Sequence, residues 1–405
     1  MVFGLCYFAE HHCAEGLFVE SHGQAHICGQ RGHVVEPCCN WHLLVLLRPS
    51  RRMVAVYGAY CRVLRTRQYA ESVPPEQPAP FPARRMRRLR RTPALRRLVA
   101  ETRLGVDDVI APLFVSEALA EPNPIASLPG VVQHTVASLR KEVRELANLG
   151  VPGVILFGLP KQKDEIGSQA WSPDGIVQVA LQELRADLGD EIVLMADLCL
   201  DEYTSHGHCG IVRPDGSVDN DATIELYAKA GVAQASAGAH VVAPSGMMDG
   251  QVAAIRTALD QHGADDVSIL AYAAKYASGL YGPFREAVDV QITGGGDRKG
   301  YQQDYRNARE ASVEVLLDLA EGADMVMVKP AVTYLDIIAK IRALTDAPLA
   351  AYHVSGEYAM IKAAAANGWI DGWGVAVEQL TAVKRAGADM ILTYFARELA
   401  EALHG

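Results

Sequence analysis

Short apolar runs recur at regular intervals from about residue 107 to the end of the chain. Each run is four to seven residues long and is flanked by polar or turn-forming residues, which is typical of a buried strand. The eight runs span 109–115, 154–157, 192–195, 240–243, 267–271, 325–328, 349–352 and 390–394. Intervening segments carry apolar residues at helical spacing, at 138–149, 176–188, 223–235, 251–262 and 332–344. The pattern predicts eight strands alternating with helices.

A weak internal repeat marks the turns that lead into four of these strands. The segments 149–155, 237–242, 321–326 and 386–391 each place a glycine at a helix end, just before an apolar run. Eight βα units in about 300 residues favour an α/β protein with a (β/α)8 TIM barrel, here over residues 107–405. A doubly wound open sheet is the alternative, but no Gly-x-Gly-x-x-Gly follows the first run.

Composition narrows the class of protein. Half of the 405 residues are hydrophobic, so the chain can bury a large core, and the net charge of −10 argues against a general nucleic-acid binder. No apolar run approaches the roughly 18–20 residues of a membrane helix. Six of the eight cysteines precede residue 62, which is not the distribution of a disulfide framework, so we expect a cytoplasmic protein without a membrane partner.

The first hundred residues differ from the rest of the chain. Residues 1–83 are rich in Cys and His, lack sustained periodicity and end in a proline-rich stretch, so we expect a disordered extension or a start codon assigned too early. A metal-binding module is the alternative, although paired zinc-finger spacing is absent. Residues 84–106 form a basic N-terminal arm with eight arginines within 84–97. In an acidic protein such an arm suits a neighbouring acidic subunit as well as a nucleic acid, and we prefer the subunit.

Two lysines stand at the ends of the fifth and sixth predicted strands. Lys275 ends the run that begins at Val267, and Lys329 ends the next run and is followed by Pro330. Catalytic groups of a TIM barrel lie at the carboxyl ends of its strands. Burial and a second nearby amine lower the pKa of a lysine, and a neutral amine attacks a ketone to form a Schiff base. The plainer interpretation of either lysine alone is an ion-paired or snorkelling residue.

The third predicted strand runs into a loop rich in thiol, carboxylate and imidazole groups. Cys199 and Asp201 are two residues apart and face the same way on an extended chain, and a turn through Gly207 could return Cys209 to them. Two thiolates and a carboxylate, completed by a histidine or water, suit Zn²⁺. The alternative is a buried cysteine pair beside a solvated turn.

Further polar residues surround the predicted barrel mouth. Arg285 and Arg298 flank the glycine-rich loop 294–296, which could close over a site, and arginines hold carboxylates bidentately. Ser355 and Tyr394 follow the seventh strand and end the eighth, where they offer hydroxyl donors to a second carboxylate.

Taken together, these motifs resemble the porphobilinogen synthase family, also called δ-aminolevulinic acid dehydratase. The resemblance runs from about Arg87 to the C-terminus. It rests on Arg87-Arg-Leu-Arg-Arg-Thr-Pro-Ala-Leu-Arg, Ala111-Pro-Leu-Phe-Val, Tyr203-Thr-Ser-His-Gly-His, Tyr281-Gly-Pro-Phe-Arg, Met327-Val-Lys-Pro-Ala and Tyr352-His-Val-Ser-Gly-Glu-Tyr.

The resemblance implies a lyase of heme and tetrapyrrole biosynthesis that condenses two 5-aminolevulinate molecules to porphobilinogen with loss of water. It implies that Lys329 holds the first substrate, with Ser355 and Tyr394 at its carboxylate. Lys275 would hold the second substrate. The residues implied around that second carboxylate are Arg285, Arg298 and Gln302, and Asp197 would assist proton transfer.

The resemblance also implies metals and an assembly. Cys199, Asp201 and Cys209 stand where part of the family has three cysteines for a catalytic Zn²⁺, and Asp201 is expected to weaken that site. Glu314 matches a position where some relatives bind an allosteric Mg²⁺ between subunits. The basic arm matches the segment that embraces a neighbour in a homo-octamer.

Two other classes of protein remain open from the sequence. A class I aldolase is also a barrel with a Schiff-base lysine, but it needs one such lysine and no thiol loop. In a non-enzymatic alternative the barrel is a scaffold and the first 80 residues are a metal-binding or interaction module.

Overall fold

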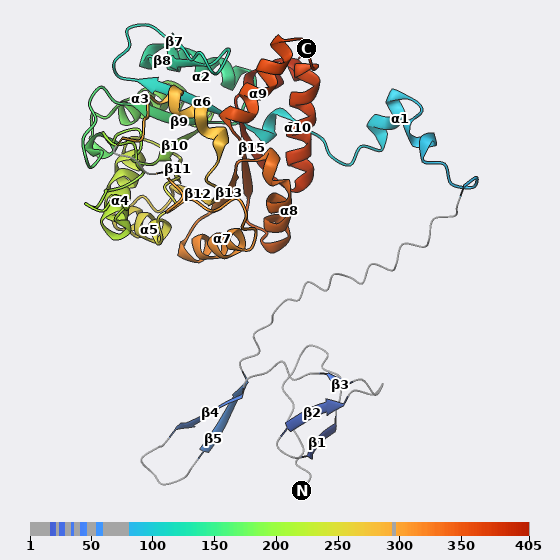
Figure 1. Ribbon diagram of the computed structural model, residues 1–405. Coiled ribbons are helices and arrows are strands. Elements are labelled where there is room, and N and C mark those ends of the chain that lie inside the picture. The colour runs from blue at the N-terminus through green and yellow to red at the C-terminus, as the bar shows by residue number, and fades with distance from the viewer. Residues whose placement is uncertain are drawn as a thin grey trace. The chain divides into compact units, whose positions relative to one another are not determined.

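A computed structural model describes residues 17–21, 24–28, 34–35, 41–46, 54–59, 81–293 and 297–404 (Figure 1). The chain divides into two compact units, Met1–Arg96 and Arg97–Gly405. In the first unit β1 (Leu17–Ser21), β2 (Gln24–Cys28) and β3 (Val34–Val35) form an antiparallel sheet, and β4 (Trp41–Leu46) pairs with β5 (Val54–Ala59). The basic segment carries the 3-10 helix η1 (Met86–Arg90) and helix α1 (Pro93–Leu98), neither with a buried residue. Most of the predicted extension 1–83 lies outside the described residues.

The second unit is a closed barrel of eight parallel strands. In barrel order these are β6 (Val109–Ser116), β9 (Gly153–Leu159), β10 (Val193–Leu198), β11 (Val241–Pro244), β12 (Ser268–Lys275), β13 (Met325–Lys329), β14 (Leu349–His353) and β15 (Met390–Thr393). The last strand pairs with the first, with Ile391 opposite Val109 and Leu392 opposite Ile110. This closure confirms the predicted TIM barrel and excludes the open sheet. Two short strands, β7 (Asn123–Pro124) and β8 (Val132–His134), extend the sheet beside the end of β6.

Helices surround these strands (Figure 1). They are α2 (Val136–Asn148), α3 (Ile176–Leu188), α4 (Asn220–Ser236), α5 (Gln251–Gln261), α6 (Gly282–Ala287), α7 (Glu310–Glu321), α8 (Leu335–Leu344), α9 (Ser355–Ala366), α10 (Gly372–Ala386) and α11 (Ala396–His404). Short 3-10 turns lie at η2 (Val106–Asp108), η3 (Ser168–Trp171), η4 (Gly279–Tyr281) and η5 (Val332–Tyr334). All five predicted helices are present, although α8 begins after η5. The helices α7, α9 and α10 were not among those predicted.

The repeated turns between helix and strand have one backbone conformation. Gly150, Gly238, Gly322 and Gly387 have φ values of 77°, 104°, 107° and 118°. This left-handed region is open to glycine at little energetic expense, which explains why each turn carries one. The weak sequence repeat is therefore a repeat of backbone geometry.

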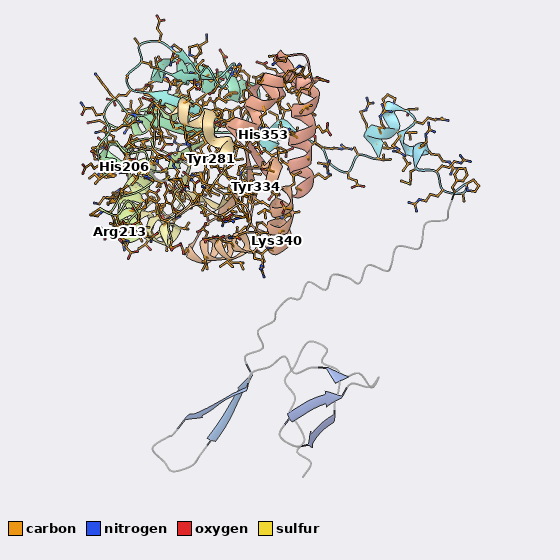
Figure 2. The ribbon with its side chains drawn as sticks, viewed as in Figure 1. His206, Arg213, Tyr281, Tyr334, Lys340 and His353 are labelled. Carbon is orange, nitrogen blue, oxygen red and sulfur yellow. The ribbon has the colours of Figure 1, made fainter. Side chains whose placement is uncertain are left out.

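The core is continuous through the barrel and under the helices. Every residue of β6 and β9 is buried, as expected for strands covered on both faces. The buried hydrophobic residues of the strands and helices form one continuous cluster, and Figure 2 shows the side chains of this unit as sticks on the ribbon. Across the described part of the chain, no helix has the length and apolar character needed to span a bilayer.

Candidate active site

Lys275 and Lys329 lie side by side at the carboxyl ends of β12 and β13. They are direct register partners in the parallel pairing of these strands, and a bulge between Ala271 and Ala274 precedes them. Their exposed fractions are 4% and 5%. The sequence prediction of two buried lysines on the fifth and sixth barrel strands is confirmed in position.

Aromatic rings enclose the amine of Lys329. Its Nζ lies 4.5 Å from the ring centroid of Tyr352, 5.0 Å from that of Tyr272, 5.3 Å from that of Tyr281 and 5.2 Å from that of Phe284. Burial, reinforced by the charge of Lys275, lowers the pKa of Lys329 to about 7. A substantial fraction of this amine is therefore neutral near pH 7.

Lys275 has a different environment from its neighbour. Its Nζ donates to the carbonyl oxygen of Ser245, the residue that follows β11. Burial works to lower the pKa of Lys275, but the groups of Cys209, Cys199 and nearby carboxylates outweigh it, and the pKa is raised. The expectation that both amines have lowered pKa values is therefore wrong for Lys275, because the thiol loop packs beside it.

Asp197 provides a buried carboxyl group beside the two lysines. It lies on β10, and its Oδ2 accepts a hydrogen bond of 3.0 Å from the hydroxyl of Ser245, whereas its Oδ1 has no partner among the described residues. Burial raises the pKa of Asp197 to about 6 against the opposing charges of Lys275 and Lys329. Such a carboxyl can take up and release protons near neutral pH.

The thiol loop forms one compact ligand set. Single ligand atoms of Cys199, Asp201 and Cys209 all lie within 4.8 Å of one another, and the three residues are buried. Gly207 has a φ of 72°, and the turn through it returns Cys209 to the strand end as predicted. The hydrogen bond from Cys199 lowers the pKa of the Cys209 thiol, whereas burial raises that of Cys199. Two sulfurs and one carboxylate at this spacing fit Zn²⁺.

Arg298 contacts both the carboxylate of this ligand set and the turn at Gly207. One terminal nitrogen of Arg298 lies 2.8 Å from Asp201 Oδ2 and donates to the carbonyl oxygen of Gly207 at 2.8 Å. Burial favours a raised pKa for Asp201, but the charges of Arg298 and Lys275 prevail and hold it well below its usual range. The Nε of Arg298 is buried without a partner among the described residues, so this side chain retains an unused donor.

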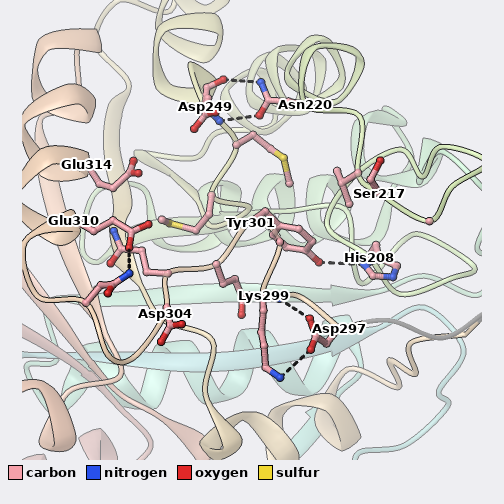
Figure 3. A pocket seen from close by; sticks show the side chains of 18 residues that line it. His208, Ser217, Asn220, Asp249, Asp297, Lys299, Tyr301, Asp304, Glu310 and Glu314 are labelled. Atoms are coloured by element: carbon pink, nitrogen blue, oxygen red, sulfur yellow. Dashed lines mark hydrogen bonds and ion pairs between the residues drawn. The ribbon is translucent and has the colours of Figure 1, made fainter.

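Both lysines line one pocket, which we call the lysine pocket, and two predicted arginines line it as well. Arg285 and Arg298 line it together with both lysines. Its full lining is Phe157, Asp197, Asp201, Glu202, Ser245, Lys275, Tyr281, Phe284, Arg285, Arg298 and Lys329. Gln302 is buried and its amide nitrogen has no partner in the described chain, but it lines the adjacent pocket of Figure 3.

Ser355 and Tyr394, predicted at the carboxylate of the first substrate, lie near the elements that enclose Lys329. Tyr394 and Tyr352 join their hydroxyl groups at 3.2 Å, and Tyr352 is the ring nearest to the Lys329 amine. Ser355 begins α9, where its Oγ accepts from the backbone N–H of Phe284 at 3.0 Å. Ser355 and Tyr394 are thus both buried at the same end of the barrel as Lys329.

Glu314 lies apart from the ligand set that includes Cys199. It projects from α7 and is half-buried, and burial together with Asp249 raises its pKa. Figure 3 shows it at the edge of a pocket with Asp249, Glu310 and Tyr301. The phenol of Tyr301 also contacts His208 and the backbone of Cys209, at 3.3 Å and 3.4 Å.

Sequence reasoning did not single out Ser245 and Glu202, which line the lysine pocket, or Tyr272, whose ring lies beside both amines. Ser245 directly follows a buried strand, and this position could have been used to find it. Tyr272 lies in β12 at the register shift between Ala271 and Ala274, and its ring centroid is 5.6 Å from Lys275 Nζ and 5.0 Å from Lys329 Nζ. Glu202 is buried beside Asp201 with an unpartnered carboxyl oxygen, and no pattern distinguished it. The loop 294–296 lies outside the described residues.

The fold and site together define an α/β barrel with two buried amines, an acid and a thiol–carboxylate ligand set at one end. The family profile described as Delta-aminolevulinic acid dehydratase matches residues 83–402. The chain belongs to this family.

Individual relatives agree with that membership. The delta-aminolevulinic acid dehydratase of Streptomyces coelicolor is 59% identical over 325 residues, covering 80% of this chain and 98% of the relative. That of Mycobacterium tuberculosis is 57% identical over 322 residues, covering 79% and 97%. The Toxoplasma gondii delta-aminolevulinic acid dehydratase (porphobilinogen synthase), solved with its reaction product porphobilinogen, has a TM-score of 0.77 and 44% identity, with coverage of 79% and 91%.

Proposed function

We propose that this chain is a porphobilinogen synthase, a lyase of heme biosynthesis that joins two 5-aminolevulinate molecules with loss of water. The observation that carries the proposal is the register pairing of Lys275 and Lys329 in one buried pocket. Two ketone substrates held on neighbouring strand ends have their reacting carbons within reach of each other. The names of the relatives support the same reaction.

Lys329 acts first in this proposal. Its lowered pKa supplies a neutral amine, which adds to the ketone of one substrate and forms a Schiff base as water leaves. The surrounding rings exclude bulk water from the new C=N bond.

Lys275 holds the second substrate through the same chemistry after it loses a proton. Asp197 is placed to move protons, because it shares Ser245 with Lys275 and has a free oxygen. Loss of a proton from the carbon beside one Schiff base gives an enamine, whose carbon attacks the other substrate. The amine of the substrate on Lys329 then closes the C–N bond of the ring at the carbon bonded to Lys275 and displaces the Lys275 amine. Loss of the Lys329 amine together with ring protons breaks the last bond to the protein and releases the aromatic pyrrole.

The two substrate carboxylates are proposed to bind on opposite sides of the lysine pair. Ser355 and Tyr394 donate hydroxyl hydrogens to the first. Arg285, the unused Nε of Arg298 and the Gln302 amide bind the second. Since both substrates are anchored at two points, the ketones are oriented as well as captured.

Cys199, Asp201 and Cys209 are proposed to hold a catalytic Zn²⁺, whose positive charge would polarise a bound substrate group. Asp201 is shared with Arg298, which supports a weaker site than three thiolates would make. We also propose that Glu314 binds an allosteric Mg²⁺. The arm 84–106 is proposed to contact a neighbouring subunit in a homo-octamer. The proposed location of the protein is the cytoplasm.

A product assay tests the proposal. Purified full-length protein with zinc and magnesium is incubated with 5-aminolevulinate, and porphobilinogen is followed by mass spectrometry. Lys275→Met and Lys329→Met are expected to abolish product, whereas Lys340→Met, on the outer helix α8, leaves it unchanged. Absence of product from the folded parent protein would contradict the proposal.

A further inference from the structure

The carboxylate of Glu357 joins two loops at the mouth of the barrel. Its Oε1 accepts from the backbone N–H of Val332, three residues after Lys329, at 2.7 Å. Its Oε2 accepts from the N–H of Val354, directly after β14, at 2.7 Å. Glu357 is 1% exposed, so both bonds are shielded from water. A helix cap alone would use only the bond to Val354. The other carboxylate oxygen instead binds Val332 in the segment that directly follows Lys329, which we call the Lys329 loop.

The residues beside Glu357 extend this junction to a third segment. Ser355 Oγ accepts from Phe284 N–H and lies 3.4 Å from the carbonyl oxygen of Leu280. A Cβ at Gly356 would lie 2.4 Å from that same carbonyl oxygen, so only glycine permits this approach. Ser355 and Gly356 thus pack against η4 and α6, and the next residue, Glu357, binds the Lys329 loop.

We propose that Glu357 is a positioning residue that fixes the separation between the Lys329 amine and the Ser355 hydroxyl. It thereby selects keto acids by the number of carbons between ketone and carboxylate. The inference rests on the proposed function, in which Lys329 takes the ketone and Ser355 the carboxylate of one substrate. Glu357 contacts neither group and acts through the two loops.

Reductive trapping with two simple keto acids tests this selection. The probes are 4-oxopentanoate, which has the ketone–carboxylate spacing of 5-aminolevulinate but no amine to condense, and 5-oxohexanoate, which is one methylene longer. Each is incubated with the full chain and borohydride at about pH 8, because burial raises the pKa of Glu357 to about 7 and the carboxylate is then mostly ionised. Peptide mass mapping gives the yield of adduct on Lys329.

The parent protein is expected to prefer 4-oxopentanoate. Glu357→Gln keeps the size of the side chain but has one oxygen acceptor, and Glu357→Asp keeps the charge but is too short to reach both loops. Each is expected to reduce the preference about tenfold, which corresponds to about 1.4 kcal/mol. Asp371→Ala is the matched control, because it removes a side-chain cap from the neighbouring helix α10 without touching the Lys329 loop.

The outcomes separate the inference from the proposed function. A general loss of stability would lower the yields of both probes alike and leave their ratio unchanged, so an unchanged ratio in folded Glu357→Gln and Glu357→Asp overturns the inference alone. If the parent protein forms no adduct on Lys329 with either probe, the proposed function fails and the inference with it. A parent protein that traps both probes equally well would also overturn the inference.

Discussion

Lys275 and Lys329 are register partners on the adjacent parallel strands β12 and β13, yet the pKa of Lys275 is raised and that of Lys329 is lowered. Parallel pairing brings the two strand ends to the same level of the barrel. Tyr352 and Phe284 enclose the Lys329 amine in apolar surface, whereas the Cys199–Cys209 loop surrounds Lys275 with acidic groups. The environments therefore give two like residues different protonation states before any substrate arrives.

The first prediction concerns the pH dependence of Schiff-base formation at Lys329. Since its pKa is lowered to about 7, the neutral and reactive amine accumulates as pH rises through 7. The initial rate of borohydride trapping of 4-oxopentanoate on Lys329 should therefore rise with a midpoint near pH 7 and level off above it. Trapping at the exposed Lys299, whose pKa is raised by its hydrogen bond to Asp297, should show no midpoint near pH 7 and should keep rising at higher pH. A Lys329 midpoint above about pH 9 would show that burial does not lower this pKa.

The second prediction concerns proton transfer by Asp197. The substitution Asp197→Asn keeps the acceptor for Ser245 but removes the titrating group. We expect the kcat for porphobilinogen formation to fall about 10²–10⁴-fold, the usual range for loss of a general acid–base. Adduct formation on Lys329 should persist. Asp304→Asn, in the pocket of Figure 3, is the control, and equal kcat values for both variants would refute the role.

The third prediction concerns metal binding by the thiol loop. Cys209→Ser replaces a sulfur ligand by a hydroxyl of similar shape, which is a poor ligand for zinc. The affinity for zinc should fall at least about tenfold. Elemental mass spectrometry should therefore find less zinc bound to the variant than to the parent protein after dialysis. Ser205→Ala, in the same loop but outside the ligand set, should retain zinc like the parent protein. Equal retention by Cys209→Ser would place the metal elsewhere.

The fourth prediction concerns stability and pH. Burial, with Glu321 and Glu314, raises the pKa of Asp318 on α7 to about 8. Its carboxyl is then protonated in the folded protein but ionised in the unfolded chain between about pH 4 and 8, so its contribution to stability decreases as pH rises through that window.

The substitution Asp318→Asn removes this titration. At pH 8 the variant should exceed the parent protein in free energy of unfolding by at least about 1.4 kcal/mol, the equivalent of one pKa unit. The gain should vanish near pH 4. Asp215→Asn, an exposed carboxyl whose pKa is lowered by Ser217, should show no gain at pH 8, and a pH-independent effect of Asp318→Asn would contradict the assignment.

The periodicity of the sequence was sufficient to predict the barrel. Each strand is a short run buried on both faces, and each return turn needs a glycine with positive φ such as Gly238. The helix α9 was not singled out because its buried residues cluster in its first turn and follow no strong stripe along its alanine-rich length.

The site was predictable where a residue's place on a strand decides its direction. This holds for Lys275, Lys329 and Cys199, which lie at or just after strand ends. The partners of Ser245 and Glu357 depend on contacts between loops that are distant in sequence, and the sequence pattern does not encode these contacts. The raised pKa of Lys275 likewise arises from a loop packed against it in three dimensions.

The central claim is that both lysines form Schiff bases with one keto acid, and borohydride trapping with 5-aminolevulinate tests it most directly. Folded protein supplied with zinc and magnesium is reduced in the presence of substrate, digested and mapped by peptide mass spectrometry. We predict adducts on Lys329 and, in a part of the molecules, on Lys275. The absence of an adduct on both lysines would contradict the two-lysine condensation and leave a barrel that carries the family's residues without its chemistry.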